Sequence, residues 1–140
     1  MFINISNHPS NKWGEKQRKA AAELGELCDN FTYLCDHIVE ITREAAAEFG
    51  ELCDRQFPTI PADASEEVVR SMAADMAGVI SAGTTAVVHV MGEMGYTHAL
   101  VTLLKAAGVR CFHSTTERTV IENADGSKTT VFEFVQFRSY

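Results

Sequence analysis

The stretch Thr85–Phe112 sets the fold class because it combines a buried strand, a turn, a helix and a second strand. Ala86–Val90 is a short apolar run rich in β-branched residues, which is typical of a strand covered on both faces. After a turn, Tyr96–Ala107 places apolar residues at helical spacing, and Gly108 follows as a C-terminal capping glycine. Two parallel strands need a helical connection of this kind. We therefore predict a βαβ unit and an α/β fold.

The rest of the chain adds strands to this unit. Phe2–Ser6 and Leu52–Phe57 have the pattern of strands, and a helix is expected over Glu66–Ser81. Near the C-terminus, two strand-like runs flank Asp125-Gly126, a hairpin turn signal. The expected fold is a single α/β domain over residues 1–140, with a mostly parallel sheet of four strands and a C-terminal antiparallel β-hairpin.

A repeat lengthens the expected first helix. Ala20–Asp29 and Ala45–Asp54 agree at nine of ten positions with an offset of 25 residues. Apolar residues between the copies alternate spacings of four and three, which predicts one unusually long helix from Lys12 to Phe49. Two helices broken near Asp29-Asn30 are the alternative. We interpret residues 20–54 as containing a helical insertion or duplication, and expect an antiparallel or dimer contact to cover its surplus apolar stripe.

Composition argues against several classes of protein. The formal charge of −7 disfavours a broad interface for long nucleic acids. No apolar run is long enough for a membrane helix, and the first residues have no signal-peptide pattern, so we expect no membrane association. The four cysteines lack zinc or CxxC spacing. We expect them to be buried thiols in a reducing cytoplasm.

Three polar runs follow predicted strands: Ser6–Ser10, Met91–Glu93 and His113–Arg118. Carboxyl ends of parallel strands meet at one edge of a sheet, where ligands bind in open α/β folds. Hydroxyl, amide and arginine groups suit a phosphate-bearing ligand, although no glycine-rich phosphate loop is present. These runs therefore predict a phosphate-ligand site at this edge.

Each candidate residue has a competing structural interpretation. His8 suits acid/base chemistry but is equally compatible with an exposed turn histidine. Glu93 is a candidate too, yet an acid at a helix N-terminus is favoured by the helix dipole. Arg118 suits a phosphate or a surface salt bridge. His89 and Trp13 are expected to be core residues, and no histidine spacing demands a metal.

Three segments together resemble a known family: FINISNHPSNKW at the start, AVVHVMGEMGYTHALVTLLKAAGVRCFHSTTER in the middle and KTTVFEFVQFRSY at the end. They are similar to small stand-alone CRISPR-associated Rossmann-like proteins of type III systems, which are ring nucleases or cyclic-oligoadenylate-binding proteins. In that pattern a single copy of the AAAEFGELCD-like stretch joins the first helix to the next strand, so about 25 residues are extra here.

The resemblance implies a homodimer that holds a cyclic oligoadenylate across its two-fold axis. It also implies cleavage without metal or cofactor, in which a ribose 2′-hydroxyl attacks the neighbouring phosphate and leaves a 2′,3′-cyclic phosphate. Such an activity acts in antiviral signalling. When the family pattern is carried onto this sequence, it implies three catalytic residues. His8 would transfer a proton, Arg118 would stabilise the charge of the phosphate, and Glu93 is the third. The implied ligand-binding residues are Ser6, Asn7, Ser10, Gly92, Thr115 and Thr116.

Two other functions remain open from the sequence. One is a module that senses a nucleotide without cleaving it. The other is a dimeric interaction protein built around the long helix.

Overall fold

A computed structural model describes residues 1–26, 52–82, 87–123 and 125–140. It contains one five-stranded sheet in the order β2-β1-β3-β4-β5. The first four strands are parallel, and β5 is antiparallel to β4. This confirms the predicted α/β class, with a mostly parallel sheet and a C-terminal antiparallel pair. The strands are β1 (Phe2–Ser6), β2 (Leu52–Gln56), β3 (Val87–Met91), β4 (Arg110–Glu122) and β5 (Lys128–Ser139).

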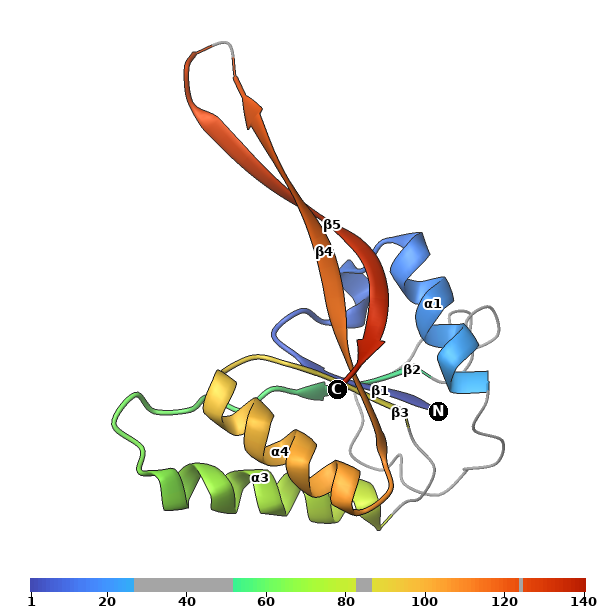
Figure 1. Cartoon of the computed structure of the whole chain (residues 1–140), viewed down its shortest axis with the longest axis vertical. Helices are drawn as coiled ribbons and strands as arrows, with labels where there is room; N and C mark the ends of the chain where they lie inside the picture. The colour runs from blue at the N-terminus through green and yellow to red at the C-terminus, as the bar shows by residue number, and fades with distance from the viewer. Residues whose placement is uncertain (27–51, 83–86, 124) are drawn as a thin grey trace.

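Helices cover both faces of the sheet. The helices α3 (Glu66–Ser81) and α4 (Met94–Ala106) lie together on one face, and α1 (Glu15–Glu26) lies on the other (Figure 1). Ser65 caps α3 by accepting a hydrogen bond from Val68 N–H, and Gly108 follows α4 in the left-handed conformation with φ +80°. Within the described ranges, no helix is long and apolar enough to cross a membrane.

The two faces of the sheet differ in chemistry because side chains alternate along each strand. The face under α3 and α4 is apolar: Ile3 and Ile5 on β1 join Val88 and Val90 on β3 in the main core. The face under α1 is apolar only near the start of the strands, where Phe2 and Val87 pack with Trp13 and Ala21. Farther along, this same face buries the polar side chains Asn4, Ser6 and His89. Buried polar groups need partners, so the α1 face is the natural place to look for a site.

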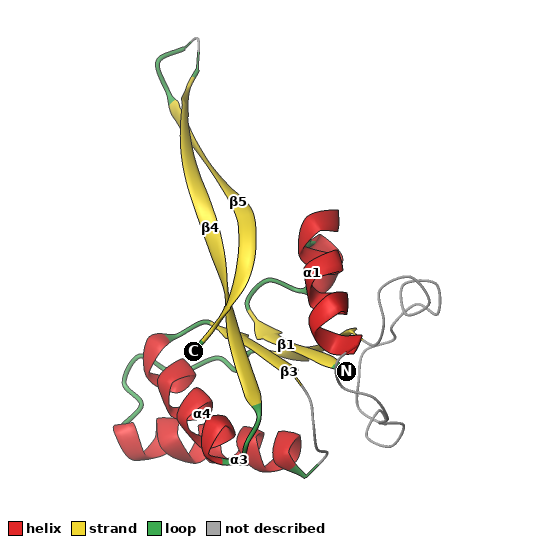
Figure 2. Ribbon diagram, turned by 45° about the vertical axis from the view of Figure 1, so that its right-hand side comes forward, coloured by secondary structure: helices red, strands yellow, loops and turns green. Residues whose placement is uncertain are grey.

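The C-terminal hairpin is larger than the sequence predicted. We expected a strand to stop at Phe112 and a polar loop to cover His113–Arg118, but β4 continues without interruption to Glu122. It pairs with β5 from Phe112 to Glu122, with a β-bulge near Thr115/Thr116. Threonine and valine suit an extended strand even when it is exposed. The two strands therefore leave the sheet as one long twisted arm (Figures 1 and 2), and the prediction of a loop was wrong.

The start of the first helix also differs from the prediction. The expected helix begins at Lys12, whereas Ser10–Lys12 form a 3-10 turn, η1, and α1 begins at Glu15 after Gly14. Within the described part of the chain α1 ends at Glu26. The remainder of the predicted long helix, its alternative break and Cys28 and Cys35 lie outside the described residues.

The two cysteines within the described residues are buried, as predicted. Cys53 lies on β2 and Cys111 on β4. Burial raises the pKa of the Cys111 thiol to about 11, which keeps it protonated at neutral pH.

Candidate functional site

A row of four hydrogen-bonded side chains crosses the sheet beneath α1. Asp54 on β2, Asn4 on β1 and His89 on β3 are register partners on adjacent strands. Asn4 Nδ2 lies 2.6 Å from Asp54 Oδ1, and Asn4 Oδ1 lies 2.8 Å from His89 Nδ1. His89 Nε2 lies 2.8 Å from the Ser114 hydroxyl of β4. We call Asp54, Asn4, His89 and Ser114 the polar row.

The polar row lies where the strand order changes direction. The chain passes from β1 outward to β2 and then returns to β3 on the other side of β1. This is the topological switch point of an open α/β sheet, where ligands usually bind near the strand ends. Asn4 and His89 sit on the two strands that flank it.

Aromatic rings enclose the histidine of the row. The ring centroids of Phe2, Trp13 and Phe137 lie 6.4, 5.6 and 5.2 Å from that of His89, which is 1% exposed. Burial and, to a lesser extent, the nearby charges of His113 and His8 together lower the pKa of His89 to about 4. The imidazole is therefore neutral at physiological pH.

The loop after β1 is fixed through the carbonyl oxygen of His8. This oxygen accepts hydrogen bonds from Asn4 Nδ2 at 3.0 Å, the Ser6 hydroxyl at 3.1 Å and Trp13 Nε1 at 3.0 Å. The side chains of Asn7 and His8 remain exposed. The His8 backbone is thus held firmly while its imidazole faces solvent.

Asp54 occupies the hydrogen-bond donors that we had predicted for a phosphate. Its carboxylate accepts from the Ser10 backbone N–H at 3.0 Å and from the Ser10 hydroxyl at 2.7 Å. The Ser6 hydroxyl is engaged with Asn4 and His8. An anionic ligand would therefore have to compete with Asp54 for the Ser10 donors.

Residues of β4 divide between the two faces of the arm. Alternation puts Thr116 and Arg118 on the same face as Ser114, and Thr115 on the opposite face. The Thr115 hydroxyl donates to the Gln136 carbonyl within the hairpin, at 3.2 Å. Arg118 follows Ser114 by four residues, which is about 13 Å along a strand. In a single chain, Arg118 therefore lies out along the arm.

Gly92 and Glu93 contribute to packing and helix capping on the other side of the sheet. A Cβ atom at position 92 would lie 2.2 Å from the Phe57 ring, so a glycine is needed there. The Glu93 carboxylate accepts from Gly95 N–H at 2.9 Å and Tyr96 N–H at 2.7 Å at the start of α4, and these bonds lower its pKa.

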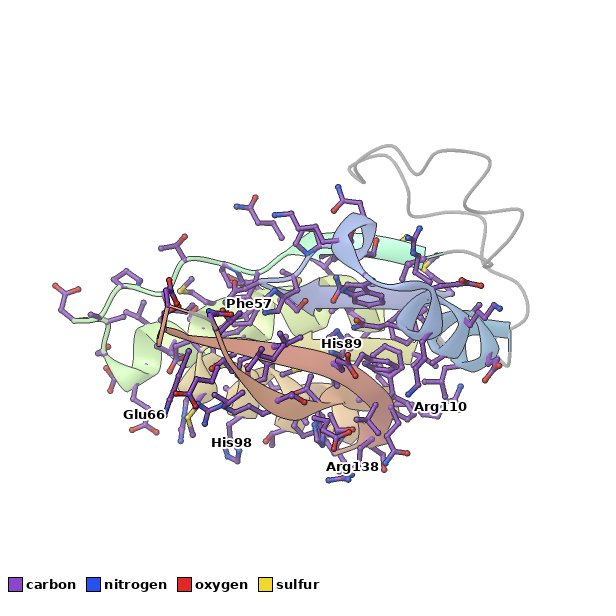
Figure 3. All side chains as sticks on the ribbon, turned by 90° about the horizontal axis from the view of Figure 1, so that it is seen from above. Phe57, Glu66, His89, His98, Arg110 and Arg138 are labelled. Carbon is purple, nitrogen blue, oxygen red and sulfur yellow. The ribbon has the colours of Figure 1, made fainter. Side chains whose placement is uncertain are left out.

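Glu93 also lines a separate groove. This groove of about 920 Å³ lies between α3 and α4 and is largely apolar, with Val69 and Leu103 in its wall. Glu66 and His98 also line the groove. Figure 3 shows these two residues at the periphery of the molecule, whereas His89 lies in its interior. Glu93 is thus placed with the groove rather than with the polar row.

The sequence did not identify Asn4 and Asp54 as members of the polar row. His89 was predicted as a core residue and is one, and Ser114 belongs to the run His113–Arg118 that was predicted to contribute to the site. The available signal was the polar pair Asn4 and Ser6 alternating with apolar residues in a buried strand. Asp54 was obscured because it belongs to the repeated segment. Within the described residues, no group of three or more His, Cys, Asp or Glu side chains is placed to hold a metal ion.

Comparison with protein families found one family whose model matches nearly the whole chain. The model of a family described as "Uncharacterized protein MJ1673 family" matches residues 1–138. The chain belongs to this family. The matched range includes the polar row and nearly all of the arm. Comparisons with curated proteins and with solved structures found no match.

Proposed function

We propose that this protein binds a cyclic oligoadenylate beside the polar row and cleaves it without metal, as a ring nuclease of type III CRISPR antiviral signalling. The sequence resemblance suggests the ligand. The observation that carries the proposal is the chain of hydrogen bonds from the His8 carbonyl, through Asn4 and His89, to Ser114 on the α1-side face of β4. The loop offers the exposed His8, and this face of β4 offers the hydroxyls of Ser114 and Thr116 and, farther along the arm, the Arg118 guanidinium.

Aromatic side chains of the arm complete a surface suited to nucleotides. Phe134 is the cross-strand partner of Thr116, and Phe132 is that of Arg118. Phe132 is 63% exposed, and the ring centroids of Phe134 and Phe137 lie 4.9 Å apart. Aromatic faces stack bases, while arginine and hydroxyl groups bind phosphate oxygens. Groups that bind phosphate and rings that stack bases thus occur together on the β4–β5 pair.

In the proposed reaction the protein positions the ligand and stabilises developing charge. A ribose 2′-hydroxyl attacks the adjacent phosphorus in line. His8 transfers a proton, and Arg118 stabilises the charge of the phosphate oxygens. Glu93 keeps its role in capping α4. A cytoplasmic location follows from an intracellular messenger as ligand and agrees with the buried Cys111 thiol.

We further propose that the arm forms a homodimer with a second copy. A two-stranded ribbon is marginally stable without further packing, yet this one exposes Val120, Ile121, Phe132 and Val135. Residues 110–140 carry four acidic and four basic side chains, although the whole chain has a net charge of −7. A surface without net charge suits a two-fold contact with itself. In such a dimer each arm extends over the neighbouring copy, so Arg118 serves a shared ligand.

The direct test is incubation of purified protein with cyclic tetra-adenylate in EDTA, with products identified by mass spectrometry. We expect linear products that end in a 2′,3′-cyclic phosphate. His8→Ala and Arg118→Ala should each slow the reaction at least tenfold. The matched controls are His98→Ala, an exposed histidine of α4, and Arg138→Ala on β5. Equal loss of activity in a variant and its control would contradict the assigned role.

A binding protein that does not cleave is the second candidate. The observation that favours it is the position of Arg118, which one chain holds about 13 Å beyond Ser114. Tight binding of cyclic tetra-adenylate with recovery of the intact ring would select this candidate over the nuclease.

A further inference from the structure

Two acceptor-only oxygens fix the direction of every hydrogen bond in the polar row. Asn4 Nδ2 faces Asp54 Oδ1 and the His8 carbonyl, and neither oxygen can donate. The amide nitrogen of Asn4 must therefore point toward them, so its oxygen faces His89. The Ser6 hydroxyl lies 2.9 Å from this oxygen and shares its one proton between it and the His8 carbonyl, which agrees with the same orientation.

The orientation of Asn4 determines the tautomer of His89. Because Asn4 Oδ1 only accepts, the proton of the neutral imidazole lies on Nδ1. His89 Nε2 then carries a lone pair, and the Ser114 hydroxyl must donate to it. This is the hydrogen-bond pattern of an activated hydroxyl: the oxygen faces a base whose other nitrogen is held by a third group.

The outer end of the row is accessible whereas its inner members are not. His89 and Asn4 are each 1% exposed, but Ser114 is partly exposed. Gln17 of α1 places its amide nitrogen 3.4 Å from the Ser114 hydroxyl oxygen. A ligand on the α1-side face of β4 would therefore meet Ser114 first.

We propose that Ser114 and His89 form a proton relay for the attacking 2′-hydroxyl, with Asn4 and Asp54 as positioning residues. This inference rests on the proposed nuclease function. The 2′-hydroxyl passes its proton to Ser114 Oγ as Ser114 passes its own proton to His89 Nε2. The 2′-oxygen bonds to phosphorus, the bond from phosphorus to the 5′-oxygen breaks, and the departing 5′-oxygen takes a proton from His8. The proton on His89 then returns to solvent through Ser114, and the exposed His8 regains a proton from solvent.

The charged neighbours of His89 favour the neutral base in the absence of ligand. Burial lowers the pKa of the imidazole most, and His113 of β4 and His8 of the β1–η1 loop lower it less, whereas Asp54 of β2 contacts it only through Asn4. A bound phosphate is negative and favours the protonated imidazole. Ligand binding would therefore make His89 a stronger base where the reaction needs one.

The first experiment determines the tautomer of His89 in the protein without ligand. Nitrogen-15 NMR of the wild-type protein at pH 7 should show Nδ1 of His89 as the protonated nitrogen and Nε2 as the unprotonated one. His98, exposed on α4, provides the internal reference for a histidine without such partners. A proton on Nε2 would overturn the relay, because Ser114 would then face a donor.

The second experiment separates binding from cleavage. Ser114→Ala should slow single-turnover cleavage of cyclic tetra-adenylate on the order of 100-fold while its Kd changes less than threefold. Ser114→Thr, which keeps the hydroxyl, should recover most of the rate. His89→Gln keeps an acceptor toward Ser114 but no basic nitrogen, and should be as slow as Ser114→Ala. Ser71→Ala on the exposed face of α3 is the control.

The outcomes separate the relay from the function on which it rests. A wild-type protein that cleaves, together with a Ser114→Ala variant that cleaves equally fast, would overturn the relay alone. A wild-type protein that leaves the ring intact would overturn both the relay and the nuclease proposal. Slow cleavage by Ser114→Ala with recovery by Ser114→Thr supports both.

Discussion

Lowering the pH from 7 toward 4 should destabilise the fold through His89. Burial lowers the pKa of this imidazole from 6.5 to about 4 in the folded protein, whereas in the unfolded chain it titrates near its ordinary value. Between these two values the unfolded state binds one more proton than the folded state. The free energy of unfolding therefore falls as the pH falls through this window. The window spans about 2.5 pH units, so at about 1.4 kcal/mol per unit the full loss is about 3 kcal/mol.

Urea unfolding from pH 4 to 7.5 measures this effect. Fluorescence of Trp13, the one tryptophan of the chain, reports on the same cluster of rings. The stability difference between the wild-type protein and His89→Gln should shrink by about 3 kcal/mol as the pH falls across the window. His98→Gln should follow the wild type, because His98 is exposed. If the free energy of unfolding changes with pH by the same amount in the wild type and in His89→Gln, the predicted effect of His89 is wrong. If His89→Gln does not fold, an NMR titration of the wild-type imidazole with a midpoint near 6.5 would refute it equally.

Three further predictions concern helix capping, packing and assembly. Glu93→Ala should cost about 1 kcal/mol of unfolding free energy in urea, because it removes the two hydrogen bonds that cap α4; an equal loss from Glu67→Ala on α3 would contradict this. Gly92→Ala should cost about 1–3 kcal/mol, because its Cβ would lie 2.2 Å from the Phe57 ring. Gly78→Ala, with nothing within 4 Å, should be neutral or stabilising. Phe132→Lys should convert a dimer to a monomer in light scattering while the secondary structure is retained, whereas Val68→Lys, a half-exposed position on α3, should leave the dimer intact.

The sequence predicted the elements whose signals are local. The bounds of β1 and α3 agree with the structure because apolar spacing and polar flanks mark them. The hairpin turn was predicted from Asp125-Gly126. In the structure Gly126 takes φ +81°, a conformation that glycine adopts freely. The α/β class followed from the strand–helix–strand pattern of one stretch.

The continuation of β4 was not predictable from local signals. His113–Arg118 is polar, so it has the composition of a loop. Its extended conformation depends on pairing with β5, about twenty residues later in the chain. Strand pairing of this kind is a tertiary effect that overrides local preference.

The polar row escaped prediction for a similar reason. Asn4, Asp54 and His89 are far apart in sequence, and only the register of three parallel strands aligns them. Ser6, His8 and Ser10 lie within five consecutive residues at the end of β1 and after it, and their role in ligand binding stays a prediction. Gly92 and Glu93 were grouped with them by strand order alone, but packing against Phe57 and capping of α4 account for their positions.

The most direct test of the account maps where the ligand binds. A cyclic tetra-adenylate whose 2′-hydroxyls are methylated cannot be cleaved, so it can be titrated into isotopically labelled protein and followed by backbone amide NMR. We predict the largest shifts at His8, Ser10, Ser114 and Thr116, beside the polar row. Shifts confined to Val69, Ala99 and Leu103, in the groove between α3 and α4, would contradict the account.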